Sequence, residues 1–184
     1  MSSLFIALLR GINVGGNNRI AMADLRACVE ATGAADVATY IQSGNVLFDG
    51  GPTSGATWRS RFEMALSERF GYAATVVVRS HAQLQATVKG APRGYGDEPD
   101  AYLYDVLFLV EPLTADEVVA TVPVREEVDE IAAGDGVVYH RRLAARATQS
   151  RFSKVVGMPI YKSMTIRNWR TTTKLLGMLD ERTG

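Results

Sequence analysis

The sequence contains few of the side chains that usually carry out metal-dependent or nucleophilic chemistry. One cysteine and two histidines occur in 184 residues. A single cysteine excludes an internal disulfide and a thiolate metal cluster, and Cys28 lies beside Leu25 and Val29 in a helical pattern that is typical of a buried thiol. Neither His81 nor His140 has a companion at metal-ligand spacing. We therefore expect neither a metal nor another cofactor.

The sequence also lacks net charge and long apolar runs. Its 20 Lys and Arg residues balance 20 Asp and Glu residues, so nothing in the total charge attracts nucleic acid or membrane. No apolar run reaches membrane-spanning length, and the N-terminus has no basic signal-peptide region. We therefore expect a cytoplasmic protein with no membrane partner.

The charges that are present are unevenly distributed along the chain. Residues 97–135 carry twelve acidic side chains and one base, Arg125, whereas residues 137–179 carry nine bases and no acid. Such segregation indicates either an anion-facing surface or two neighbouring elements that neutralise each other.

Apolar periodicity and turn residues predict two copies of a βαββαβ order. The first copy has four strands and two helices, at residues 4–10, 22–32, 37–41, 46–48, 54–70 and 74–78. The second has the same elements and an extra C-terminal helix, at residues 104–110, 114–121, 126–132, 137–141, 150–156, 160–164 and 168–179. We predict an α+β fold of two ferredoxin-like modules.

The predicted domains are a first module at residues 1–79, a short helix and connector at residues 80–100, and a second module at residues 101–184. The first strands of both modules, LFIALL and YDVLFLV, are apolar on successive residues instead of alternating. Strands of this kind are usually covered on both faces. We therefore expect the two modules to pack intimately against each other.

The most distinctive segment is LFIALLRGINVGGNNR, residues 4–19. It leads from an apolar strand into a loop with three glycines, two arginines and three asparagines, which offers many N–H donors for an anion. In a βαββαβ module this loop and the 42–45 hairpin turn share one sheet edge. We predict a ligand-binding rim formed by Arg10, Gly11, Asn13, Gly15, Gly16, Asn17, Arg19, Gln42, Ser43 and Asn45. The alternative is that these residue types only reverse the chain.

A second polar segment, TIRNW, precedes the C-terminal helix. Asn168 stands at the N-cap position. Arg167, Arg170 and Lys174 gather at the positive end of the helix dipole, where cations are unfavourable unless an anion lies among them. We therefore add Arg167 and Asn168 to the predicted ligand-binding residues.

Two charged clusters face each other across the predicted hairpin turn at residues 134–136. The acidic cluster is Glu126, Glu127, Asp129 and Glu130, and the basic cluster is His140, Arg141 and Arg142. The acids could suggest a cation site, but cross-strand ion pairing explains both clusters. We expect Arg141 or Arg142 to pair with Asp129 or Glu130.

The blocks IALLRGINVGG, TYIQSGNVLF and TIRNWRTTTKL together resemble the signature blocks of the bacterial domain of unknown function 1697 family. The resemblance spans nearly the whole chain in order and implies two ferredoxin-like α+β modules. It implies no activity. The residues that match the motif positions include most of the predicted site residues. Gly44, Trp169, Thr171 and Lys174, which are outside the predicted site, also match. Ile166 stands where a threonine is expected, which puts a role for a hydroxyl there in doubt.

Two functions fit these observations. The first is binding of a small phosphorylated or carboxylated ligand at the rim of the first module, with or without catalysis. The second is nucleic-acid binding through the basic region at residues 140–174, because RNA-recognition domains share the βαββαβ order. The aromatic RNP1 pattern is absent from both candidate third strands, and this absence favours the first function.

Overall fold

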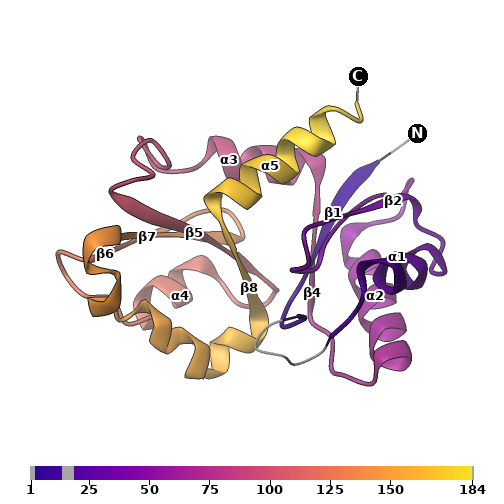
Figure 1. The fold of residues 1–184 in the computed structure, drawn as a ribbon, viewed down its shortest axis with the longest axis horizontal. Coiled ribbons are helices and arrows are strands. Elements are labelled where there is room, and N and C mark those ends of the chain that lie inside the picture. The colour runs from indigo at the N-terminus through magenta and orange to yellow at the C-terminus, as the bar shows by residue number, and fades with distance from the viewer. Residues whose placement is uncertain (1–2, 14–18, 184) are drawn as a thin grey trace. The chain divides into compact units, whose positions relative to one another are not determined.

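The computed structural model describes residues 3–13 and 19–183, and the chain divides into two compact units (Figure 1). The first unit comprises Met1–Gln85 and Leu175–Gly184, and the second comprises Ala86–Lys174. The domain limits predicted above, like the intimate packing of the two modules, stay predictions. Among the described residues, no helix is long and apolar enough to cross a bilayer.

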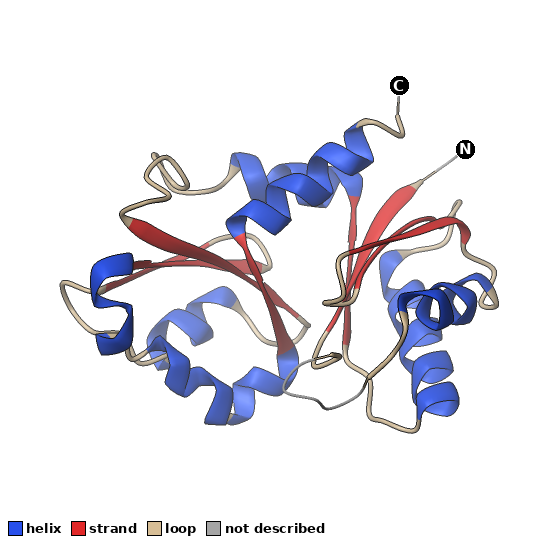
Figure 2. Ribbon diagram, viewed as in Figure 1, coloured by secondary structure: helices blue, strands red, loops and turns tan. Residues whose placement is uncertain are grey.

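The first unit contains a four-stranded antiparallel sheet in the order β2-β3-β1-β4. Its elements are β1 (Leu4–Leu9), α1 (Met22–Glu30), β2 (Ala35–Tyr40), β3 (Asn45–Asp49), α2 (Gly55–Phe70) and β4 (Val76–Ser80). Helices α1 and α2 cover one face of this sheet (Figure 2). The predicted βαββαβ order is therefore confirmed for this unit.

The core of the first unit forms where apolar residues of β1 meet the apolar stripe of α2. All six residues of β1 are buried, and Phe5 packs with Phe48, Trp58 and Phe62 in one cluster. Ser54 caps α2 by accepting a hydrogen bond from the Thr57 amide at 3.2 Å. The predicted limits of α2 are thus confirmed by its cap and by its apolar face.

The second unit repeats this arrangement with the strand order β6-β7-β5-β8. Its sheet and first crossover consist of β5 (Tyr102–Leu109), α4 (Ala115–Thr121), β6 (Asp129–Ala133), β7 (Val137–Leu143) and β8 (Met164–Asn168). Helix α4 starts with a complete capping box between Thr114 and Glu117. Both sheets are antiparallel and carry helices, which confirms the predicted α+β class.

The second crossover of this unit differs from the prediction. Three short 3-10 helices, η1 (Ala144–Gln149), η2 (Phe152–Gly157) and η3 (Pro159–Ser163), replace the single α-helix expected at residues 150–156. The strand expected at residues 160–164 is wrong, because β8 runs from Met164 to Asn168, paired with β5. The spacing of Phe152, Val155 and Met158 is three residues, which matches the 3-10 period and imitates part of an α-helical stripe.

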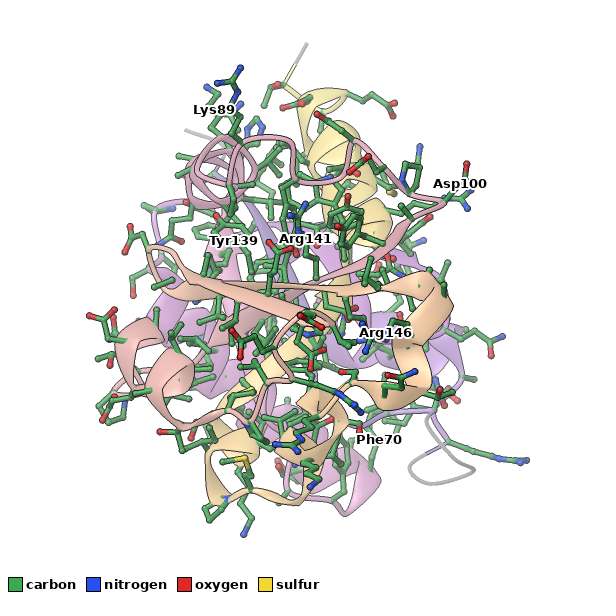
Figure 3. All side chains as sticks on the ribbon, turned by 90° about the vertical axis from the view of Figure 1, so that its left-hand side faces the viewer. Phe70, Lys89, Asp100, Tyr139, Arg141 and Arg146 are labelled. Carbon is green, nitrogen blue, oxygen red and sulfur yellow. The ribbon has the colours of Figure 1, made fainter. Side chains whose placement is uncertain are left out.

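The segment between α3 (His81–Lys89) and β5 packs on the second unit's sheet face opposite α4. Tyr139 and Arg141 extend from one side of β7 toward it (Figure 3). Tyr95 contacts the rings of Tyr104, Tyr139 and Trp169 edge-on at 4.9–5.5 Å. Its hydroxyl lies 2.7 Å and 2.8 Å from two carbonyl oxygens of the sheet, and burial raises the Tyr95 pKa well above its usual range. This sheet face is therefore occupied by the protein's own aromatic side chains.

Helix α5 (Trp169–Asp180) begins in the second unit and ends in the first. Asn168 Oδ1 accepts a hydrogen bond from the Thr171 amide at 2.7 Å, so the predicted N-cap is confirmed. At the other end, His81 Nε2 lies 2.6 Å from Asp180 Oδ1. Arg182 donates to the Asp36 carbonyl at 3.0 Å.

The charged hairpin of β6 and β7 forms the predicted cross-strand ion pair. Arg141 Nη2 bonds both carboxylate oxygens of Glu130, at 2.9 and 2.7 Å. Arg142 instead bonds Asp105 on the other neighbouring strand at 3.0 Å. The acidic and basic clusters therefore neutralise each other in part, as the sequence indicated.

Candidate functional site

Asn13 connects the loop that follows β1 with the β2–β3 hairpin. Its Nδ2 donates to the carbonyl oxygens of Ile20 at 3.0 Å and of Gln42 at 2.9 Å. Its Oδ1 accepts from the Ile20 amide at 2.9 Å. Asn13 has a φ of 54°, in a left-handed region where asparagine is enriched. Both amide donors of Asn13 are thus used by the backbone, so this side chain sets the position of the loop relative to the hairpin.

The hairpin turn lies directly against the end of β1. The Leu9 amide donates to the Gly44 carbonyl at 2.8 Å. Gly44 has a φ of 77°, and a Cβ atom there would come within 2.8 Å of side-chain atoms of Leu9 and Ile12. Only glycine satisfies both the conformation and the close approach. The loop after β1 and the hairpin turn therefore meet at one edge of the first sheet.

Asn45 and Ser43 stabilise the interior of this turn. Asn45 is fully buried, and its Nδ2 donates to the Tyr40 carbonyl at 3.1 Å and to Ser43 Oγ at 2.9 Å. Because a buried amide must satisfy its donors within the protein, Asn45 has a clear structural role. Asn45 therefore stabilises the turn in which Gln42 presents an exposed side chain.

A hollow of about 450 Å³ lies where the loop and the hairpin meet. Its walls are formed by Asn13, Arg19, Ile20, Ala21 and Gln42. Three of these, Asn13, Arg19 and Gln42, are among the predicted ligand-binding residues. Ile20 and Ala21 give part of the wall an apolar character, which the sequence did not indicate. The described wall holds a guanidinium and two carboxamides but no carboxylate.

The charge at this hollow comes from Arg19, which is exposed. Within residues 3–13 and 19–183 Arg19 forms no ion pair, whereas Arg26 on α1 bonds Glu30 at 2.7 Å. Because both donors of Asn13 are already used, the groups left to face a ligand are the Arg19 guanidinium and the Gln42 carboxamide, a cation and an amide that suit polar groups. The described wall of the hollow thus carries one positive charge and no negative one.

The other predicted residues of the first unit occupy the same edge or are not described. Arg10 and Gly11 stand between β1 and Asn13, and Arg10 is half-buried, with its backbone amide bonded to the Thr75 carbonyl at 3.0 Å. Gly15, Gly16 and Asn17 lie outside the described residues. That each of these residues takes part in ligand binding stays a prediction.

Arg167 and Asn168 belong to the second unit. Arg167 Nη1 donates to Thr165 Oγ1 at 3.0 Å and to the Ile166 carbonyl at 2.9 Å. Burial lowers the Arg167 pKa to about 10, which the phenolic oxygen of Tyr161 partly opposes. Asn168 uses its side chain as the N-cap of α5. That Arg167 and Asn168 contribute to the ligand-binding rim of the first unit stays a prediction.

Sequence reasoning missed a buried polar network under the second crossover. The Asp129 carboxylate accepts hydrogen bonds from the Arg125 and Arg151 amides at 2.8 and 3.0 Å, from Ser150 Oγ, and from His140 Nε2 at 3.2 Å. His140 is fully buried and stacks on Phe152. Although Ser, His and Asp meet here, Ser150 bonds the carboxylate and not the imidazole, so the order of a nucleophilic triad is absent.

Metal binding finds no support in the part of the chain that is described. No group of three or more His, Cys, Asp or Glu side chains there could hold a metal ion. Cys28 is buried in the core of the first unit, and burial raises the pKa of its thiol, an effect that Arg69 partly opposes. Cys28 therefore has the environment of a structural residue.

Comparison with known proteins supplies a family and a structural relative. The family model described as protein of unknown function (DUF1697) matches residues 2–139. A solved structure of a conserved bacterial protein from Streptococcus pneumoniae is similar to the chain, with 27% sequence identity and a TM-score of 0.84. The match covers 97% of this chain and 99% of that one. No curated protein matches.

Proposed function

The chain belongs to the family of proteins of unknown function DUF1697, and from that premise we propose that it binds a small phosphorylated or carboxylated ligand. The proposed site is the hollow between the loop after β1 and the β2–β3 hairpin. One observation carries the proposal: the Asn13 side chain bonds the backbone of Ile20 and of Gln42, and so joins the loop to the hairpin at a hollow that Arg19 and Gln42 line. The proposal leaves open whether the ligand is also transformed.

The geometry supports an anion at this position for two reasons. Arg19 forms no ion pair within the described part of the chain, and no carboxylate lines the described wall of the hollow, so a ligand anion would gain a charge-assisted hydrogen bond. Asn13 is already held by the backbone, so the site needs little rearrangement when a ligand binds. Pre-organisation of this kind lowers the entropy cost of binding.

Nucleic-acid binding through residues 140–174 is the alternative, and two features of the second unit argue against it. Two of its bases, Arg141 and Arg142, already pair with Glu130 and Asp105. Tyr95 packs on the sheet face that an RNA-recognition domain would use.

A thermal-shift screen tests the proposal. The probes are inorganic phosphate, sugar phosphates, nucleotides, dicarboxylates and short RNA, each at several salt concentrations. A small ligand that binds the folded protein raises the melting temperature by mass action, whereas stabilisation through a nucleic-acid backbone falls steeply with salt. The proposal predicts a small anionic binder. Stabilisation by RNA alone would support the alternative.

Substitutions then locate the site. Arg19→Gln should weaken the binding of the best probe about tenfold to a hundredfold, the worth of a charge-assisted hydrogen bond. Arg26→Gln on α1 removes the same charge away from the hollow and serves as the control. Arg10→Ala and Arg167→Ala should cause a similar loss if each guanidinium bonds the ligand. Equal binding by the Arg19 and Arg26 variants would contradict the proposed position.

A further inference from the structure

A cavity of about 180 Å³ lies wholly within the second unit, where the segment before β5 packs on the β6–β7 hairpin. Figure 3 shows Tyr139 and Arg141, two of its lining residues, on the same side of β7. None of its lining residues belongs to the hollow beside the loop after β1. This cavity is therefore separate from that hollow.

One wall of this cavity is a face of the β6–β7 hairpin. Glu130 lies opposite Arg141, and Ala132 lies opposite Tyr139. Because side chains two residues apart along a strand share a face, these four lie on one face, and all four line the cavity. Arg141 is held by both carboxylate oxygens of Glu130, at 2.9 and 2.7 Å, and by the Tyr102 ring at 4.4 Å. The two opposite charges of this wall therefore cancel.

Another wall is the turn at residues 92–95, which carries a third charge on Arg93. The Tyr95 amide donates to the Pro92 carbonyl at 2.9 Å. The Tyr95 hydroxyl donates to the carbonyls of Asp105 and His140 at 2.7 and 2.8 Å, so this turn is anchored to the sheet. Arg93 is exposed and, in the part of the chain that the structure describes, forms no ion pair. The lining of the cavity thus has one net positive charge.

The size and the aromatic lining of the cavity narrow the class of ligand. An apolar cavity of about 150 Å³ binds benzene, so about 180 Å³ accommodates one six-membered ring with a small substituent. Nucleotides and other larger ligands need sites of about 300–1,000 Å³. Tyr95 and Tyr139 already meet edge-on at 5.5 Å, which is a geometry in which aromatic rings attract each other. A ligand ring would extend this aromatic cluster.

We propose that this cavity binds a small carboxylate with a single aromatic ring. The ring contacts Tyr139, Ala132 and Pro92, and the carboxylate bonds Arg93. The planar guanidinium of an arginine matches a carboxylate through two parallel hydrogen bonds. This inference does not rest on the proposed function, because the two sites share no residue and belong to different units.

Titrations followed by amide chemical shifts test this inference with benzoate as the probe. Benzamide has the same shape without the charge, and acetate has the charge without the ring. Benzoate should produce saturable shifts of the backbone amides of Arg93, Tyr95 and Ala132. Benzamide and acetate should bind about tenfold to a hundredfold more weakly, since one lacks the charge-assisted hydrogen bond and the other lacks the apolar contact.

Two pairs of variants locate the site. Arg93→Gln should weaken benzoate binding about tenfold and leave the weaker binding of benzamide unchanged. Arg125→Gln removes an exposed arginine of the same unit that does not line the cavity, and should change neither. Ala132→Leu should fill part of the cavity and abolish benzoate binding, whereas Ala133→Leu at the exposed neighbouring position should not. Because Arg93 is exposed, its variant keeps the test decisive if Ala132→Leu does not fold.

The outcomes separate this inference from the proposed function. Benzoate shifts confined to the amides of Arg19, Ile20 and Gln42 would support the proposed function and overturn this inference. A saturable shift of the Arg93 amide with benzoate, without any effect of phosphate at the loop hollow, would support this inference alone. Equal binding of benzoate and benzamide, unchanged benzoate binding by Arg93→Gln, or no saturable shift with benzoate would each overturn it.

Discussion

Replacing Asp129 by asparagine tests the account of the second crossover. Both side chains have the same shape, but asparagine has no charge, and an NH₂ group replaces one carboxylate oxygen. Oδ2 of Asp129 accepts hydrogen bonds from the backbone amides of Arg125 and Arg151. Oδ1 accepts hydrogen bonds from Ser150 Oγ and His140 Nε2. The amide oxygen can still serve the backbone. The new NH₂ group would then face His140 Nε2. That nitrogen can accept a hydrogen bond from the NH₂ group only when it carries no proton of its own.

The cost follows from the burial of this group. The side chains of Asp129 and His140 are both fully buried, so water cannot replace the lost partner. Hydrogen bonds to a charged acceptor contribute about 1.5–3 kcal/mol each, and neutral ones about 0.5–1.5 kcal/mol. Breaking one strong bond and weakening the others predicts a loss of about 3–5 kcal/mol in the free energy of unfolding for Asp129→Asn.

The effect should depend on pH in a defined direction. Burial is the largest influence on the Asp129 pKa and raises it. The hydrogen bonds from Ser150, the two backbone amides and His140 outweigh burial and bring the pKa below its usual value. The charged carboxylate therefore stabilises the fold fully above the unfolded pKa of about 3.9. That stabilisation disappears as the pH falls through the lower folded pKa, so the difference between parent and Asp129→Asn should shrink on acidification.

The assay is urea unfolding followed by circular dichroism at about pH 7, 5 and 3, with hydrogen exchange of the Arg125 and Arg151 amides. Glu130→Gln is the matched control. Glu130 is on the same strand and pairs with Arg141, but its side chain is 60% exposed, so its loss should cost about 0–1 kcal/mol. An equal cost for the two variants, or an Asp129→Asn cost that persists at low pH, would refute the reasoning.

Two further substitutions test contacts that position the elements. Tyr95→Phe keeps the ring but removes the phenolic donor from one buried and one partly buried carbonyl oxygen. It should lower the free energy of unfolding by about 1–2 kcal/mol in urea titrations; an unchanged value would mean that the ring contacts alone hold this segment. Gly44→Ala places a Cβ atom 2.8 Å from Leu9 and Ile12 in a left-handed turn. It should lower the melting temperature by about 2–8 °C by calorimetry, and a parent-like temperature would show that the turn can shift without cost.

Local patterns predicted most of the fold correctly. The continuous apolar run of β1, the Ser54 cap of α2 and the Asn168 cap of α5 depend on residues close together in sequence. The error in the second crossover has a physical cause, because 3-10 turns with apolar residues every three positions imitate a short α-helix. The strand predicted at residues 160–164 ends where the observed strand begins, because the strand paired with β5 starts at Met164.

The candidate site was predicted in outline but not in detail. Topology brings the loop after β1 and the hairpin turn to one sheet edge, so the neighbourhood of Asn13 and Gln42 could be inferred. The way Asn13 bonds two backbone segments depends on contacts 7 and 29 residues away in sequence, which no local pattern encodes. The network around Asp129 likewise includes contacts with Ser150 and Arg151, 21 and 22 residues away.

A phosphate titration monitored by amide chemical shifts in two-dimensional nuclear magnetic resonance tests the central claim most directly. The account predicts saturable shifts of the backbone amides of Arg19, Ile20 and Gln42 and of the Asn13 side-chain amide, all of which surround the hollow. Arg19→Gln should reduce these shifts at a given phosphate concentration, and Arg26→Gln should not. Saturable shifts confined to other parts of the protein, or none at all with phosphate, would contradict the claim that this hollow binds an anion.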